Sequence, residues 1–148
     1  MITNKIKILS VLVGLFLVLA MVPLAFAVNE DGKIIKGGKL LVTKVDAKVD
    51  GKTDKNLDFG DLIRREAKPG SAVEFKIQFT NNFTKDQDLK IENIDTTVTI
   101  QGIDDGDDMD QDAKEFDLRA TRDDTVTVQF KLPLEMDEDT FDVLVNAE

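Results

Sequence analysis

The chain has 148 residues, with 19 lysine and arginine side chains against 29 aspartate and glutamate side chains and a formal net charge of −10. It contains no histidine, cysteine, tryptophan or tyrosine, which excludes disulfide bonds, imidazole or thiolate metal ligands, and catalysis by a histidine base or a cysteine nucleophile. The acidic balance also argues against partners made of nucleic acid or anionic lipid.

The first 27 residues have the pattern of a secretion signal. Lys5 and Lys7 give a positive start, residues 8–20 are almost wholly apolar, and Ala25-Phe26-Ala27 matches an A-x-A cleavage pattern. The apolar stretch that ends at Ala27 is also long enough to stay in the membrane as an uncleaved anchor. We therefore predict an apolar signal helix within residues 1–27 and export through the general secretory route, with membrane contact only through this segment if it is not cleaved.

The rest of the chain is expected to form one domain behind a short linker. Residues 28–38 are polar and contain three glycines, which is typical of a linker. Without residues 1–27 the chain keeps 121 residues, 17 basic and all 29 acidic side chains, and a net charge of −12. This is a normal size for one domain with its own core, and we place that domain at residues 39–148.

The first half of this domain contains two predicted strands. Residues 41–50 alternate between one face with Leu41 and Val45 and another face that is charged, which predicts a strand with one solvated face. Residues 50–68 show no clear period and are expected to be a packed loop with at most a short strand or a turn of helix. A Pro69-Gly70 turn closes this loop. Residues 73–80 then alternate without a fault and predict the central core strand.

The second half continues the alternation. After a turn at residues 84–88, residues 89–103 predict a long strand that bends near residues 93–95, where the apolar positions change phase. Residues 102–114 are expected to be an acidic loop. Three shorter alternating runs follow, at residues 116–118, 126–132 and 141–145. Strands spaced by turns in this way predict an all-β domain, an antiparallel β-sandwich of about six to eight strands.

The order of these features resembles the immunoglobulin-like modules of prokaryotic surface proteins, namely CARDB-type domains and related archaeal S-layer-associated domains. The similar features are the Pro69-Gly70 turn before the central strand, the pair Asn81-Asn82 after it, and Pro133 at the end of the penultimate strand. Residues 120–124 stand where these modules usually have a glycine turn, and Phe141 stands in place of their usual tyrosine. The resemblance implies an immunoglobulin-like β-sandwich and an extracellular spacer, adhesive or envelope-assembly role, and it carries no catalytic residues.

Two clusters of oxygen ligands are candidate calcium sites, because calcium takes six to eight oxygen ligands and aspartates can supply them. Neither matches the EF-hand loop, in which glycine and glutamate occupy fixed positions. In both, a solvated polar turn or loop is the alternative interpretation. The candidate ligands are Asp104, Asp105, Asp107, Asp108 and Asp110 in one cluster, which Asp112 extends, and Asp54, Asn56 and Asp58 in the other.

The tripeptide Asn82-Phe83-Thr84 matches the N-glycosylation acceptor pattern on a predicted surface turn. The alternative is structural, because asparagine tolerates the left-handed backbone conformation that often follows a strand. Catalysis has little support. Ser71 is the only serine after the signal, and it stands at the start of a strand with no lysine in an apparent pocket beside it.

These observations favour an exported, non-enzymatic module of the cell envelope, either secreted or held at the cell surface. We expect a structural, spacer or adhesive role, other envelope or surface proteins as partners, and no cofactor unless calcium binds. The alternative is a calcium-dependent module that binds carbohydrate or protein through its acidic loops. The absence of tryptophan and tyrosine argues against carbohydrate, because sugar-binding platforms usually stack the ligand on those side chains.

Overall fold

The computed structural model describes residues 15–17, 27–28, 34–36, 39–58, 60–136 and 139–148. These residues form thirteen β-strands joined by turns and loops. Within this part of the chain no helix is long and apolar enough to cross a membrane. The fold is all-β, and nearly all of its strand pairs are antiparallel, as predicted. The predicted signal helix lies outside the described residues, except for Leu15–Leu17, which form a three-residue strand, and Ala27, which belongs to a strand with Val28.

One sheet is built around the predicted central strand. Its strand order is β12-β7-β4-β3-β2, and β5 also pairs with β4. Antiparallel pairing joins β7 to β12 along one side and to β4 along the other. The strands are β2 (Ala27–Val28), β3 (Ile34–Lys36), β4 (Leu40–Val49), β5 (Lys52–Leu57), β7 (Ala72–Asn81) and β12 (Asp123–Lys131).

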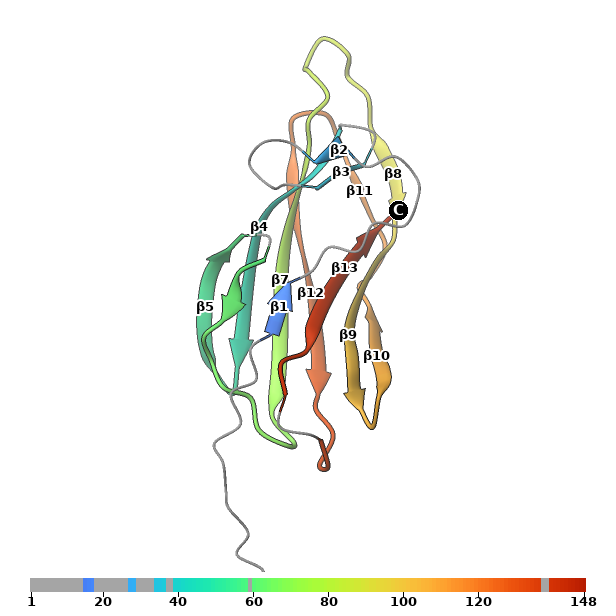
Figure 1. Ribbon diagram of the computed structural model, residues 1–148. Coiled ribbons are helices and arrows are strands. Elements are labelled where there is room, and N and C mark those ends of the chain that lie inside the picture. The colour runs from blue at the N-terminus through green and yellow to red at the C-terminus, as the bar shows by residue number, and fades with distance from the viewer. Residues whose placement is uncertain (1–14, 18–26, 29–33, 37–38, 59, 137–138) are drawn as a thin grey trace, which may run out of the picture.

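The second sheet has the order β10-β9-β13-β1-β6. It packs against the first sheet so that the strands of both run along the length of the molecule (Figure 1), an arrangement consistent with a β-sandwich. A small third sheet pairs β8 with β11. The second sheet contains β1 (Leu15–Leu17), β6 (Leu62–Ile63), β9 (Thr96–Asp104), β10 (Asp107–Asp112) and β13 (Asp142–Ala147), and the third contains β8 (Ile91–Ile94) and β11 (Phe116–Leu118).

The core lies between the inner faces of the two large sheets. Val73, Phe75, Ile77 and Phe79 of β7 are at most 2% exposed, because every second side chain of a strand points to the same face. Phe75 meets Phe130 of β12 edge-to-face, with ring centroids 6.0 Å apart. The ring of Phe79 lies 5.5 Å from that of Phe116, so that the third sheet joins the same core.

A polar network holds the turns at the lower end of Figure 1 together. The Ser71 N–H donates to the Lys68 carbonyl oxygen over 2.8 Å, with Pro69 and Gly70 between them, and Gly70 has a φ of 76° that a type II turn requires. The Ser71 hydroxyl donates to Asp50, whose carboxylate also accepts the Ala72 N–H. These bonds hold the pKa of Asp50 below its ordinary value. Ser71 therefore has a structural contact at its hydroxyl.

Several predicted boundaries need correction. Residues 102–114 are not a loop but the β9–β10 hairpin, which turns at Asp105 and Gly106. The predicted loop at residues 50–68 contains β5 and β6. The predicted count of six to eight strands is too low, because short and polar strands carry little periodic signal. The predicted long strand at residues 89–103 is two strands in different sheets: β8 ends at Ile94 and β9 begins at Thr96, with a positive φ at Asn93 where the bend was predicted.

Part of the predicted linker joins the first sheet. Within residues 28–38, Ile34–Lys36 forms β3, which pairs antiparallel with the start of β4. Val28 belongs to β2, which pairs with β3 in turn. The remaining residues of the predicted linker lie outside the described residues.

Replacement of Phe75 by aspartate is expected to unfold the domain. The side chain is fully buried, and removing such a phenylalanine alone costs about 3–5 kcal/mol. An unpaired buried carboxylate adds several kcal/mol, which together approach the whole stability of about 5–15 kcal/mol. Circular dichroism and urea denaturation measure the effect. Thr127→Asp, on the exposed face of β12, is the control and should stay folded; a Phe75→Asp variant with native melting would contradict the core assignment.

Candidate functional site

The acidic residues of the first predicted calcium cluster are spread along the β9–β10 hairpin. Asp104 ends β9, Asp105 lies in the turn, and the others follow on β10. Met109, between Asp108 and Asp110, packs against the core, so these two carboxylates point to the opposite face of β10, while Asp107 lies before a register shift. The strand geometry therefore separates carboxylates that a flexible loop would allow to converge.

The outward carboxylates of β10 accept hydrogen bonds from β9. Asp108 accepts the Gly102 N–H over 2.8 Å, Asp110 accepts the Thr99 hydroxyl over 2.5 Å, and Asp112 accepts the Thr97 hydroxyl over 2.8 Å. β10 is the terminal strand of its sheet. Charged side chains on such an edge discourage pairing with another chain, so the acidic run has a structural explanation that needs no metal.

The second predicted cluster lies around β5. The Asp54 carboxylate accepts the N–H groups of Arg64 and Arg65 over 2.7 and 3.1 Å, and it lies 3.2 Å from the Arg65 Nε. Asn56 has a φ of 54° and donates its N–H to Asp46. Asp58 closes a turn with Asp61, whose carboxylate accepts the Asp58 N–H. Asp54 thus connects β5 to the segment after β6.

Asp54 and Asn56 line a shallow groove of about 470 Å³ between β5 and β6, together with Asp61. Asp58 does not line it. Two basic side chains, Lys55 and Arg64, line the same groove. Nowhere in the described part of the chain do three or more acidic side chains come close enough to hold a metal ion.

Calcium up to about 5 mM is expected to leave the melting temperature unchanged, because the candidate ligands are dispersed or already bonded. A site with a dissociation constant of about 0.1 mM would add about 2 kcal/mol at that concentration and raise the melting temperature by several degrees. Thermal melts of chelator-treated protein measure this, with magnesium at equal concentration as the control. A rise specific to calcium would support the calcium-dependent alternative.

Asn81 is a buried polar residue whose role the sequence did not reveal. Its side-chain amide donates to the carbonyl oxygens of Leu89 and Leu118, each over 2.9 Å, and its Oδ1 accepts the Phe83 N–H. Its backbone N–H donates to Arg122, and its carbonyl oxygen accepts the Thr121 N–H. One side chain at the end of β7 therefore ties together the β7–β8 loop and β11, while its backbone holds the turn before β12.

The left-handed backbone conformation that was the structural alternative at Asn81-Asn82 is not observed, because neither residue has a positive φ. Positive φ values occur nearby at Asp88, in the β7–β8 loop, and at Thr121, at 60° in the turn before β12. Asn82 is exposed and donates only its backbone N–H, to Lys39. Its side chain is therefore accessible, and its glycosylation stays a prediction.

Asn81→Asp is expected to destabilise the domain by about 2–4 kcal/mol, because a carboxylate cannot donate and would face two buried carbonyl oxygens. Asn82→Asp is the matched control, since its side chain is exposed, and it should change stability by less than about 0.5 kcal/mol. Urea denaturation of both variants measures the difference. Equal losses would contradict the assigned role of Asn81.

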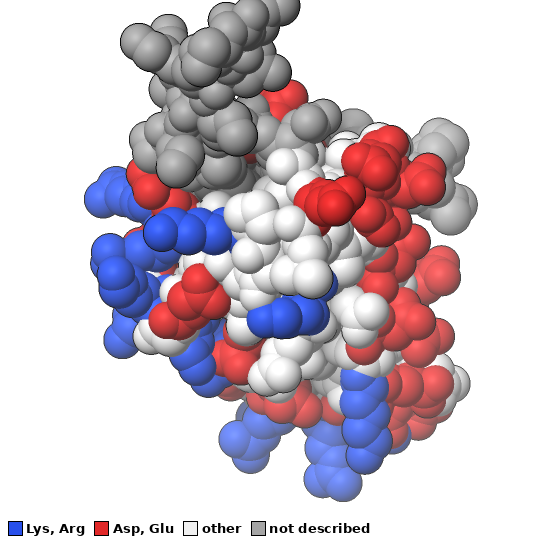
Figure 2. All heavy atoms as spheres, turned by 90° about the horizontal axis from the view of Figure 1, so that it is seen from below, with Lys and Arg blue, Asp and Glu red and all other residues white. Residues whose placement is uncertain are grey.

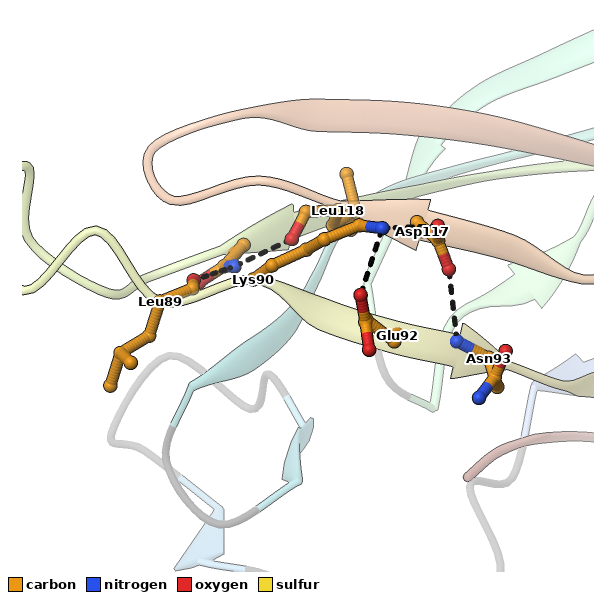
Figure 3. Close-up of polar contacts among 7 residues, drawn as sticks. Leu89, Lys90, Glu92, Asn93, Asp117 and Leu118 are labelled. Carbon is orange, nitrogen blue, oxygen red and sulfur yellow. Dashed lines mark hydrogen bonds and ion pairs between the residues drawn. The ribbon is translucent and has the colours of Figure 1, made fainter.

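Lys90, Glu92 and Asp117 form a charged cluster between β8 and β11 (Figure 3). The Lys90 Nζ lies 2.5 Å from Asp117 and 3.0 Å from Glu92, and Asp117 also accepts the Asn93 N–H. Hydrogen bonds to Asp117 and then Glu92 raise the pKa of Lys90, while those from Lys90 and then Asn93 lower the pKa of Asp117. Because its pKa is raised, the Lys90 amine stays protonated, and a protonated amine cannot attack the Asp117 carboxyl group to form an amide bond. The cluster therefore favours a salt bridge over a covalent bond.

Comparisons of the chain with protein-family models, with curated proteins and with solved structures found no match.

Proposed function

We propose that the chain is an exported, non-enzymatic module of the cell envelope with a structural, spacer or adhesive role. The observation that carries this proposal is an antiparallel all-β domain that directly follows an N-terminal secretion pattern. Its partners would be other envelope or surface proteins. The protein would be either secreted or held at the surface, with membrane contact only through residues 1–27 if they remain attached.

The immunoglobulin-like subtype is part of the proposal. It is supported by the Pro69-Gly70 turn, by the packing of β7 between β4 and β12, and by Pro133 just after β12. It is also supported by Thr121, whose left-handed backbone occupies the position of the usual glycine turn. Since the modules this chain resembles serve as extracellular spacers and adhesive units, the subtype agrees with the envelope role.

A non-enzymatic role is supported by the contacts of the polar residues that could act as nucleophiles. The Ser71 hydroxyl donates to Asp50 and accepts the Lys68 N–H, so it is held by the turn. Lys90 stays protonated beside two carboxylates. The carboxylates of Asp50 and Asp117, which these two residues contact, have lowered pKa values and are therefore weak bases.

The second candidate function is calcium-dependent binding of carbohydrate or protein. It is favoured by one observation, the groove between β5 and β6 in which the predicted ligands Asp54 and Asn56 lie with Asp61. The engagement of Asp54 with Arg64 and Arg65 weighs against it. The calcium titration described above tests this function directly.

Production of the full chain in a secreting host tests the proposed export. We expect the protein outside the cytoplasm with Val28 as its first residue, because cleavage should follow Ala27. Intact-mass measurement of the exported fraction reads the new N-terminus, and Ala27→Arg is a control that should block cleavage. Membrane-bound protein that keeps residues 1–27 would indicate the anchor, and retention in the cytoplasm would contradict export.

A further inference from the structure

Opposite charges collect on opposite edges at one end of the molecule. Figure 2 views the lower end of Figure 1, and it shows lysine and arginine mainly on the left and aspartate and glutamate mainly on the right. In Figure 1, β5 lies on the left and the tip of the β9–β10 hairpin lies at the lower right. A chain with a net charge of −10 thus keeps a locally basic surface.

The basic surface includes a hollow of about 390 Å³, which we call the basic hollow. Four basic side chains and two acidic ones line it, together with Val49. They are Lys52, Arg64, Arg65 and Lys68, and Asp50 and Glu66. Lys52 begins β5, and the other three basic residues follow β6 on the segment that leads to the Pro69-Gly70 turn. The hollow therefore lies where the edges of the two large sheets meet.

The charges in the basic hollow are only partly neutralised within the molecule. The Asp50 carboxylate accepts hydrogen bonds from neutral groups and keeps its negative charge, which attracts Lys68, and Arg65 is paired with Asp54. The ion pairs found among the described residues do not involve Lys52, Arg64 or Lys68. An acidic group that entered the hollow would meet these three cations, which outnumber the remaining acidic side chain, Glu66.

The opposite edge offers a group of this kind. The end of the β9–β10 hairpin carries Asp104, Asp105 and Asp107, which we call the acidic tip, and residues 104–112 contain six aspartates and no basic residue. Asp104 lies directly opposite Asp107 in the register of the two strands. Like charges at opposed positions repel each other, so a cationic partner at the tip would relieve a repulsion that the fold itself creates.

We propose that the basic hollow of one copy of this chain binds the acidic tip of a second copy. Because the two surfaces differ and lie on opposite edges, the contact is heterologous, and its repetition gives open chains of molecules side by side. This inference goes beyond the proposed export, since association in solution does not depend on where the protein resides. Second copies are favoured over other acidic partners because the same molecule presents both complementary surfaces.

The contact consists of exposed charges, so it is weak and depends on salt. At about 0.1 M salt the screening length is about 10 Å, which suppresses the long-range repulsion between acidic molecules and preserves contacts at close range. At about 1 M it falls to about 3 Å, and the contact pairs are screened as well. Association should therefore be present at moderate salt and lost at high salt.

Sedimentation velocity of the protein, in the form in which it accumulates on export, tests the proposal. At about 0.1 M salt the weight-average mass should rise with protein concentration, and at about 1 M it should return to that of the monomer. A monomer at every concentration in moderate salt would overturn the proposal. Association that persists in high salt would also overturn it, since it would indicate an apolar contact.

Charge-reversed variants identify the two surfaces. Lys52→Glu with Arg64→Glu reverses the hollow, and Asp104→Lys with Asp107→Lys reverses the tip while keeping like charges opposite each other. Each variant alone should be monomeric. A mixture of the two should associate again, because the basic tip of one fits the acidic hollow of the other.

Lys85→Glu with Arg122→Glu is the matched control, because it changes net charge as the hollow variant does but alters the loop between β7 and β8 and the turn before β12, which lie at the upper end of Figure 1. The control should still associate. Loss of association in the control to the same extent, or a mixture that stays monomeric, would overturn the proposal. Circular dichroism verifies that each variant is folded. If a double variant is unfolded, the single change Arg64→Glu or Asp107→Lys replaces it. Each single change is expected to weaken association several-fold.

Discussion

The burial of one face of β7 is the constraint on which the rest of the structure depends. Val73, Phe75, Ile77 and Phe79 point into the core, while β4 and β12 satisfy the backbone of β7 on its two sides. A shift of one residue in register would bring Glu74, Lys76, Gln78 and Thr80 into the core, so the register is strongly specified. Asn81 then helps to fix the direction in which the chain leaves the sheet, because its buried amide donates to the carbonyl oxygens of Leu89 and Leu118.

The acidic residues illustrate how a strand changes the chemistry of a sequence. Six aspartates within nine residues would converge readily on a flexible loop, but the hairpin spreads them over β9, the turn and β10, and three of those on β10 are bonded to β9. Their charge then protects an exposed sheet edge and leaves the hairpin end strongly negative. The same composition that first indicated calcium is thus explained by edge protection and, in the proposed assembly, by attraction to the basic hollow of a neighbour.

An envelope role and self-association would support each other. A module displayed at a surface is present at high local concentration, so that weak contacts between copies become effective there. Open heterologous contacts extend without limit, which suits a surface array better than a soluble enzyme. The polar side chains that most resemble catalytic groups, those of Ser71 and Lys90, serve instead to hold a turn and to join two strands.

The sequence by itself determined the all-β class, the core strand, the Pro69-Gly70 turn and the bend between β8 and β9, because alternation and turn chemistry are local properties of the chain. It did not predict that residues 102–114 form a hairpin, since aspartates are rare in strands and only pairing with β9 stabilises them there. Nor could it show that Asn81 is buried while Asn82 is exposed. Those outcomes, and the meeting of Lys52 with Arg64 in one hollow, depend on contacts between distant segments that only the tertiary structure brings together.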